Sequence, residues 1–210
     1  MLKILIADDH AIVREGLKQI LGATPDMVVA GEATSGTEAL KMARQAPYDV
    51  VLLDISLPGK NGLEVLKQLR LESARMPILM LSMYPEEQYA LRALKAGANG
   101  YLTKESAPDE LITAIGKVSR GSNYVSASLA EKLAAYLGRE TNKRPHQLLS
   151  DREYQVMLMI ASGRTVSEIA QELMLSVKTI STNRARSLQK LGMKSNSEFT
   201  YYAVKEGLVP

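Results

Sequence analysis

The fold of this chain is indicated most directly by residues 48–62, YDVVLLDISLPGKNG. Residues 48–53 are apolar over most of their length, without the alternation of a half-exposed strand, which is typical of a central parallel strand buried on both faces. The run ends at Asp54, and the following cluster of Pro58, Gly59, Asn61 and Gly62 is typical of a turn. This stretch therefore predicts a buried strand that carries an acidic side chain at its carboxyl end.

The same pattern repeats through the first half of the chain. The predicted strands are residues 3–7, 27–32, 48–53, 77–81 and 99–102, and the predicted helices are residues 10–21, 37–45, 63–71, 85–96 and a segment from 108 onward. Five strands that alternate with five helices predict an α/β fold with a doubly wound, five-stranded parallel sheet. Right-handed crossovers then bring all the strand carboxyl ends to one edge of the sheet.

The second part of the chain has a different pattern. Residues 126–137 are predicted to form a linker helix, and residues 138–147 are polar, charged and interrupted by proline, which predicts a flexible linker. Predicted helices then cover residues 150–163, 166–173, 176–191 and 196–205, and the first of them opens with a Ser150–Glu153 capping box. We therefore expect three parts: a domain over 1–125, a linker region over 126–147 and a small all-α domain over 148–210.

Composition excludes several classes of protein. With 46% hydrophobic and 23% charged residues, the 210-residue chain has the composition of a globular protein. It has no cysteine, which excludes disulfides and thiolate chemistry, and two histidines are too few for a multi-histidine metal site. Its apolar runs are shorter than the roughly 18–20 residues of a membrane span, and the first strand meets an acidic pair too early for a secretory signal. We expect a cytoplasmic protein without a membrane partner.

Charge is distributed unevenly along the chain. The first 128 residues carry 14 Lys/Arg against 15 Asp/Glu, and the remaining residues carry 12 against 8. Residues 176–194 contain five basic side chains and no acidic one: Lys178, Arg184, Arg186, Lys190 and Lys194. This asymmetry indicates either a domain that meets a polyanion or a solvated basic helix face.

Five polar side chains follow the predicted strands at the shared edge of the sheet. They are Asp8 and Asp9 after the first strand, Asp54 after the third, Ser82 after the fourth and Lys104 after the fifth. Single acidic residues at such positions are often turn or helix caps, but carboxylates gathered in one crevice repel each other unless a cation neutralises them. Oxygen ligands of this kind favour Mg²⁺. Asp54 is then a candidate nucleophile for a phosphoryl group, with Lys104 and Ser82 as its stabilising partners.

The basic region has the spacing of a helix-turn-helix, with its second helix over residues 176–191. A helical wheel predicts a buried stripe of Val177, Ile180, Leu188 and Leu191, with Arg184 inside it. The candidate DNA-binding residues are Lys178, Thr179, Ser181, Thr182, Arg184, Ala185, Arg186, Lys190 and Lys194. The small side chains suit base contacts in a major groove, and the basic ones suit phosphates.

The acidic edge resembles the phosphoacceptor site of two-component receiver domains. Beyond the five edge residues, the resemblance covers the segments LDISLPGKNG (53–62) and AGANGYLTK (96–104). It implies a flavodoxin-like fold in which Asp9, Asp54 and the backbone carbonyl of Ser56 hold Mg²⁺, with Asp8 acting through water. It also implies that Tyr101 is a switch residue coupled to Ser82. One departure is Glu105, where many receivers have proline.

The helical domain resembles the LuxR-type DNA-binding domain through LSDRE (149–153), EIA (168–170), SVKTI (176–180) and KLG (190–192). The whole chain therefore looks like a NarL/FixJ-family response regulator. That resemblance implies a transcription regulator that is not an enzyme. A sensor histidine kinase would phosphorylate Asp54, and the partners would be double-stranded promoter DNA, RNA polymerase and a second copy in a homodimer. Asn183 stands where relatives commonly have histidine or tyrosine, which affects base preference.

Two alternatives belong to other classes of function. A regulator that works without phosphorylation would use the acidic site only structurally. An aspartyl-phosphate phosphatase would usually need a second acid two residues after its nucleophile, where this chain has Ser56. One further alternative concerns the last helix, whose Phe199, Tyr202 and Ala203 are either a dimer contact or part of the domain core.

Overall fold

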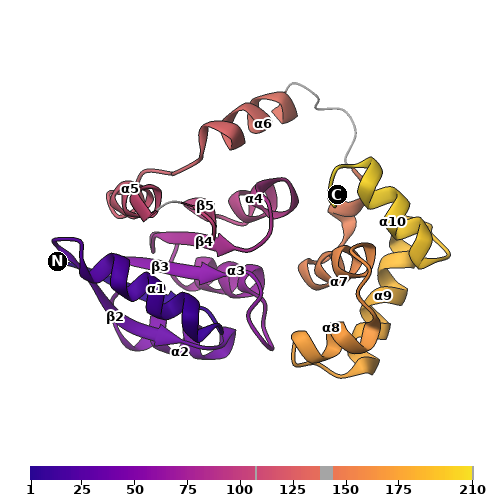
Figure 1. The fold of residues 1–210 in the computed structure, drawn as a ribbon, viewed down its shortest axis with the longest axis horizontal. Coiled ribbons are helices and arrows are strands. Elements are labelled where there is room, and N and C mark those ends of the chain that lie inside the picture. Colours follow the sequence, from indigo (N-terminus) through magenta and orange to yellow (C-terminus); the bar gives the residue numbers. More distant parts are fainter. Residues whose placement is uncertain (107, 138–143, 210) are drawn as a thin grey trace. The chain divides into compact units, whose positions relative to one another are not determined.

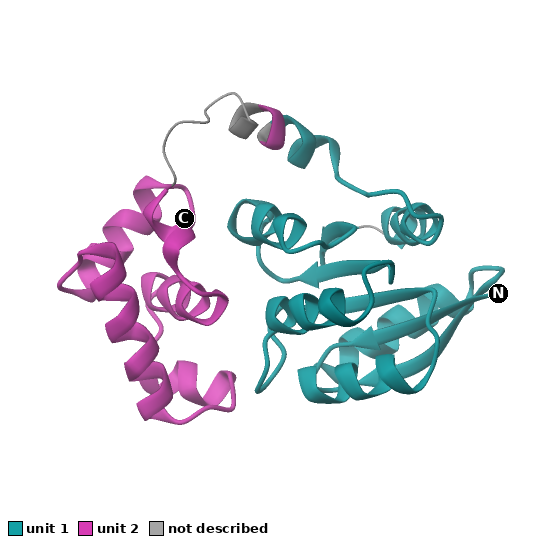
Figure 2. Ribbon diagram, turned by 180° about the vertical axis from the view of Figure 1, so that it is seen from behind, with its two compact units in different colours: residues 1–131 teal, residues 132–210 magenta. Residues whose placement is uncertain are grey.

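The computed structural model of the protein describes residues 1–106, 108–137 and 144–209. The chain divides into two compact units, 1–131 and 132–210 (Figure 2). This division falls inside helix α6 (Ala127–Leu137). The three-part division of the chain at 125/126 and 147/148 stays a prediction.

The first unit contains one five-stranded parallel sheet with the strand order β2-β1-β3-β4-β5 (Figure 1). Its strands are β1 (Leu2–Ala7), β2 (Met27–Ala33), β3 (Val50–Asp54), β4 (Ile78–Ser82) and β5 (Gly100–Thr103). The predicted doubly wound sheet is confirmed, and the observed strand ends lie within two residues of the predicted ones. Because β1 has β2 on one side and β3 on the other, the winding direction reverses at β1, and the carboxyl ends of β1 and β3 border the crevice formed there.

Helices cover both faces of this sheet. They are α1 (Ala11–Gly22), α2 (Gly36–Gln45), α3 (Gly62–Glu72), α4 (Glu86–Lys95) and α5 (Pro108–Val118). Leu17 and Leu21 of α1 share a hydrophobic cluster with Leu111 and Ile115 of α5, and one face of β1, β3, β4 and β5 completes that cluster. Right-handed connections place α2, α3 and α4 on the opposite face. Packing on both faces explains why residues 50–53 are fully buried and uniformly apolar.

The second unit is helical. After a 3₁₀ turn, η1 (Pro145–Leu148), it contains α7 (Asp151–Ala161), α8 (Val166–Glu172), α9 (Val177–Leu191) and α10 (Asn196–Lys205). The predicted capping box of Ser150 and Glu153 is present, Ser176 caps α9, and Gly192 ends α9 in the left-handed region with φ 67°. Within the described ranges, no helix has both the length and the apolar character that crossing a membrane requires.

The predicted flexible linker ends in packed structure. Its residues 138–143 lie outside the described residues. Within η1, His146 is buried, and its Nδ1 lies 2.8 Å from the hydroxyl of Tyr202 on α10. The predicted linker is therefore anchored at His146, because a histidine that looks solvated in a polar stretch finds a partner 56 residues further along the chain.

Candidate functional sites

The strand ends bring three of the predicted side chains, and the neighbouring His10, into one cluster. Carboxylate oxygens of Asp8, Asp9 and Asp54 and a ring nitrogen of His10 all lie within 4.8 Å of one another. Asp8 and Asp54 are almost fully buried, whereas Asp9 and His10 are more accessible. The sheet therefore places three carboxylates where their mutual repulsion is strongest unless a cation is present.

Lys104 supplies a cation to this cluster. Its Nζ lies 2.6 Å from Asp8 Oδ2 and 2.9 Å from Asp54 Oδ2, and its side chain is 5% exposed. The backbone N–H of Lys104 donates to the carbonyl of Ser82, which fixes the loop after β5 to the end of β4. Burial lowers the pKa of the Lys104 ammonium, but the carboxylates of Asp54 and Asp8 outweigh burial and raise it. Lys104 is therefore charged at neutral pH.

The Asp54 carboxyl group has a raised pKa of about 6, against an ordinary value of 3.8. Burial is the main cause, Lys104 opposes it, and the nearby Asp8 adds to it. The backbone N–H of Ser56 donates to the carboxylate and also opposes the rise. One lysine thus compensates the buried negative charge only in part, and this donor set of carboxylate oxygens fits a hard divalent cation.

The loop after Asp54 is held in place because Gly62, the first residue of α3, lies very close to the backbone of Asp54 and Ile55. The N–H of Gly62 donates to the carbonyl of Ile55 at 2.9 Å, and a Cβ at Gly62 would lie 2.0 Å from the carbonyl oxygen of Asp54. Asn61, which is 1% exposed, caps α3 in a capping box with Glu64. The turn that the sequence predicts here therefore positions the backbone of Asp54 itself.

Ser82 and Tyr101 meet at the same backbone segment. The hydroxyl of Ser82 accepts a hydrogen bond from the N–H of Tyr84 at 3.0 Å, and the hydroxyl of Tyr101 donates to the carbonyl of Tyr84 at 2.8 Å. Tyr101 is fully buried. The two predicted switch residues are thus linked through Tyr84, which the sequence reasoning did not single out. The Lys104–Glu105 peptide bond is trans.

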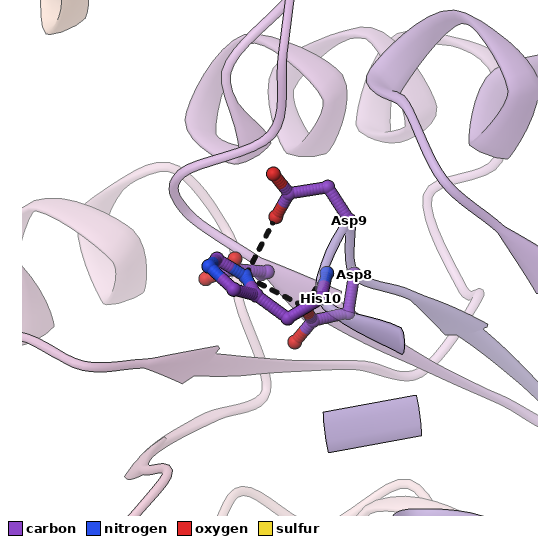
Figure 3. A group of neighbouring side chains, drawn as sticks. Asp8, Asp9 and His10 are labelled. Atoms are coloured by element: carbon purple, nitrogen blue, oxygen red, sulfur yellow. Dashed lines mark hydrogen bonds and ion pairs between the residues drawn. The ribbon is translucent and has the colours of Figure 1, made fainter. Parts of the chain in front are cut away.

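His10 is the neighbour of this cluster that the sequence reasoning missed. Its Nδ1 lies 2.9 Å from Asp9 Oδ1 and 3.3 Å from Asp8 Oδ1, and Figure 3 shows the ring beside both carboxylates. The backbone N–H of His10 also donates to Asp8 Oδ1. In the sequence, the signal for this residue is its position directly after the acidic pair.

The outward face of α9 carries the predicted DNA-binding side chains. Lys178, Thr179, Ser181, Thr182, Ala185, Arg186 and Lys190 on α9, and Lys194 just beyond it, are all exposed. Thr182 Oγ1 donates to the carbonyl of Lys178, and Asn183 donates to that of Thr179. On the buried side, Ile180 and Leu188 lie with Ser187, whose hydroxyl contacts the carbonyls of Glu153 and Asn183.

Val177 differs from the predicted helical wheel, and two basic residues of α9 have partners within the domain. Val177 is 51% exposed, because side chains point towards the helix N-terminus and the first residue of α9 extends beyond its packed part. Arg184 Nε donates to Asn196 Oδ1 at 2.6 Å, which ties α9 to the first residue of α10. Lys190 Nζ lies 2.6 Å from Glu153 Oε2. Both cations thus already have partners within the domain.

The last helix packs into the core of its unit. Phe199 and Ala203 are fully buried, and α10 packs against α7. Tyr202 contacts His146 of η1. Of the two interpretations of this face, the structure supports core packing, and a dimer contact through Phe199 and Ala203 is excluded because both side chains are covered.

Comparison with known proteins follows the same two-part division. The family model of the response regulator receiver domain matches residues 4–116, and that of the luxR family of bacterial regulatory proteins matches residues 147–203. The response regulator UvrY of Escherichia coli strain K12 is 38% identical over 209 residues, which cover 99% of this chain and 96% of UvrY. The response regulator GacA of Pseudomonas aeruginosa is 36% identical over 210 residues, which cover 100% of this chain and 98% of GacA.

Solved structures agree with these matches. RcsB from Salmonella enterica serovar Typhimurium, bound to promoter P1flhDC in the presence of the phosphomimetic BeF3⁻, superposes with a TM-score of 0.67 at 27% identity. The superposition covers 97% of this chain and 98% of RcsB. The order of the two domains is therefore shared with these relatives.

Proposed function

This chain belongs to the two-component response regulators that join a receiver domain to a LuxR-type DNA-binding domain, and we propose that phosphorylation of Asp54 by a sensor histidine kinase controls its binding to promoter DNA. It is a transcriptional response regulator by this membership. The roles of individual residues, the kinase, Mg²⁺, RNA polymerase and the homodimer are parts of the proposal. So are a cytoplasmic location and the domain limits 1–125, 126–147 and 148–210.

The observation that carries the proposal is the charge balance around Asp54. Its carboxylate is 2% exposed and lies beside a lysine that it shares with Asp8. Asp9 adds a third carboxylate within 4.8 Å. A buried carboxylate in such surroundings is disfavoured as an anion, and a divalent cation would stabilise both this charge and the further negative charge that a phosphoryl group brings.

Each edge residue has a distinct chemical task in phosphoryl transfer. An Asp54 oxygen attacks phosphorus while the P–N bond to a phosphohistidine donor breaks, so the new P–O bond replaces the old bond without a net change in oxidation state. Lys104 stabilises the negative charge on the transferring phosphoryl oxygens. Mg²⁺, held by Asp9, Asp54 and the Ser56 carbonyl with Asp8 through water, would neutralise charge on the same oxygens when bound.

The hydrogen bonds at Tyr84 suggest how phosphorylation of Asp54 changes the structure around Tyr101. A phosphoryl group on Asp54 would recruit the Ser82 hydroxyl as a donor, and rotation of this side chain towards the phosphoryl group would break its present bond with the Tyr84 N–H. Since Tyr84 also accepts the Tyr101 hydroxyl bond, movement of the 82–84 segment changes the environment of Tyr101. The two arrangements of this segment are the bistable element that phosphorylation biases.

In the DNA-binding domain, α9 is the proposed recognition helix. Ser181, Thr182 and Ala185 would meet base edges, while Lys178, Thr179, Arg186 and Lys194 would meet phosphates. Arg184 and Lys190 stay in the proposed contact set, and each would contact DNA while it also contacts its partner in the domain, Asn196 or Glu153. A homodimer would present two such helices to two half-sites.

The experiment measures oligomeric size and binding to an operator library, with and without acetyl phosphate and Mg²⁺. Wild type is compared with Asp54→Asn and with the matched control Asp26→Asn. Asp26 lies far from the site in sequence and has φ 66°, a conformation that asparagine tolerates. We expect phosphorylation to produce dimers and tighter DNA binding in wild type and Asp26→Asn, and neither in Asp54→Asn.

Other outcomes support the alternatives. If the DNA affinity of wild type did not change with acetyl phosphate, this result would support a phosphorylation-independent regulator. Continuous turnover of a phosphomonoester, in place of stoichiometric labelling, would support a phosphatase.

A further inference from the structure

The side chain of His10 lies against the carboxylates of the acidic pair that precedes it in the sequence. His10 is the residue before α1, and its side chain makes no capping hydrogen bond to that helix. Its side chain is 60% exposed, yet its Nδ1 faces the Asp9 carboxylate at 2.9 Å and the Asp8 carboxylate at 3.3 Å (Figure 3). Helix capping therefore does not account for the orientation of this ring.

These distances match those between ligands of one metal ion. Adjacent ligands of an octahedral ion bound at about 2.1 Å lie roughly 3.0 Å apart. The separation between His10 Nδ1 and Asp9 Oδ1 is close to this value, and the four candidate ligand atoms of the cluster lie within 4.8 Å of each other. One ion can thus contact the imidazole and the carboxylates without a large rearrangement.

The ammonium of Lys104 leaves this side of the cluster available. It contacts Asp8 and Asp54 through their Oδ2 atoms, whereas His10 contacts Asp8 through Oδ1. With three carboxylates and one lysine, the cluster holds two negative charges in excess when all the acids are ionised. A divalent cation on the His10 side balances them.

The fourth ligand group of the cluster, the imidazole of His10, decides which cation the cluster prefers. Oxygen-only sites suit Mg²⁺, whereas imidazole nitrogen is a poor ligand for Mg²⁺ and a good one for first-row transition ions. We propose that His10 is a metal ligand through Nδ1, and that it shifts the selectivity of this site from Mg²⁺ towards transition ions such as Mn²⁺. The inference rests on the proposed metal site but not on phosphorylation of Asp54.

The test is a metal titration of the full chain without phosphodonor. Mn²⁺ and Mg²⁺ affinities are measured by calorimetry for wild type, His10→Ala and His10→Gln, and the Mn²⁺ complexes are analysed by pulsed EPR for coupling to ¹⁴N of a directly bound imidazole. We expect this coupling in wild type and its loss in both variants. We expect Mn²⁺ affinity to fall roughly tenfold or more in His10→Ala, because even outer-shell partners of a ligand contribute that much, and Mg²⁺ affinity to change little.

His10→Gln separates coordination from positioning. Its amide can still hydrogen-bond Asp9, so if His10 only orients Asp9, this variant should retain Mn²⁺ affinity. An equal loss of Mg²⁺ and Mn²⁺ affinity, or ¹⁴N coupling that persists in His10→Ala with His146 still present, would overturn the inference. Thermal unfolding of the variants checks that the fold is kept, as the exposed side chain leads us to expect.

The two proposals fail separately. A wild type that shows ¹⁴N coupling but never accepts phosphoryl would retain the His10 ligand and contradict the function proposed for Asp54. A wild type that is phosphorylated with Mg²⁺ but shows no imidazole bound to Mn²⁺ would retain the function proposed for Asp54 and contradict the His10 ligand.

Discussion

The ammonium of Lys104 lies 2.9 Å from the carboxylate of Asp54, and both side chains are almost completely buried. Since Lys104 also contacts Asp8, one cation serves two acids. Much of the chemistry expected at this edge of the sheet depends on this excess of acidic groups over the single cation.

Removal of this cation should raise the pKa of Asp54 further. In Lys104→Met, the burial of Asp54 and the repulsion by Asp8 are no longer opposed by a positive charge. We expect the carboxyl pKa to rise above its present value of about 6. A ¹³C NMR titration of aspartate-labelled protein without metal measures it, with the exposed Lys60→Met as a control. A pKa that is unchanged or lower would show that the pair is not the main stabiliser of the anion.

The stability of the receiver unit should depend on pH through Asp54. Its folded pKa of about 6 is higher than the ordinary value of 3.8, so the folded state holds the proton more tightly than the unfolded state does. Stability should therefore fall as pH rises from about 4 to about 6, by on the order of 3 kcal/mol for this group. Asp54→Asn removes this loss and should be more stable than wild type at pH 7.

Urea unfolding in EDTA at pH 4 and pH 7 measures this difference. Asp26→Asn should follow wild type at both values. If Asp54→Asn were less stable than wild type at pH 7, the buried carboxylate would be a net stabiliser, contrary to the direction of its pKa.

Gly62→Ala should distort the phosphoacceptor loop. The added Cβ would lie 2.0 Å from the carbonyl oxygen of Asp54, and a backbone atom cannot rotate away as a side chain can. We expect a loss of several kcal/mol in stability and a slower reaction with acetyl phosphate. Gly22→Ala is the matched control, because no atom lies within 4 Å of its Cβ position at the end of α1. Similar behaviour of the two variants would contradict the close approach.

Tyr101→Phe should uncouple β5 from the segment after Ser82. The change removes the 2.8 Å bond to the Tyr84 carbonyl and leaves that acceptor without this donor. We expect a loss of about 1 kcal/mol in unfolding free energy, together with a weaker response of DNA binding to phosphorylation. Denaturant unfolding and binding titrations measure the two effects. An unchanged response to acetyl phosphate would exclude a switch through the Tyr101 hydroxyl.

Basic residues on the α9 face should contribute to DNA affinity in a salt-dependent manner. Lys178→Ala and Arg186→Ala each remove one proposed phosphate contact. We expect weaker binding to all sequences and a decrease of about 0.9 in the slope of log K against log salt for each. Fluorescence anisotropy at several salt concentrations measures this, with Lys60→Ala of the receiver unit as a control. An unchanged slope would remove that residue from the contact set.

Local sequence determined most of the secondary structure. The helix over residues 196–205 has the predicted limits, Ser176 and Gly192 start and end α9 as expected, and the buried run 50–53 lies in the centre of the sheet. These features follow from hydrophobic periodicity, caps and backbone preference, which are properties of neighbouring residues. The gathering of Asp8, Asp9, Asp54 and Lys104 could also be predicted, because parallel strands with right-handed crossovers bring their carboxyl ends to one edge.

Tertiary structure alone decided which partner each polar side chain has. Arg184 contacts Asn196, Lys190 contacts Glu153, and the hydroxyls of Ser82 and Tyr101 meet at Tyr84, none of which any local pattern indicates. Periodicity specifies the side of an element on which a residue lies, but the atom it meets depends on how distant elements pack, and hydrogen bonds and ion pairs are decided over differences of a few tenths of an ångström.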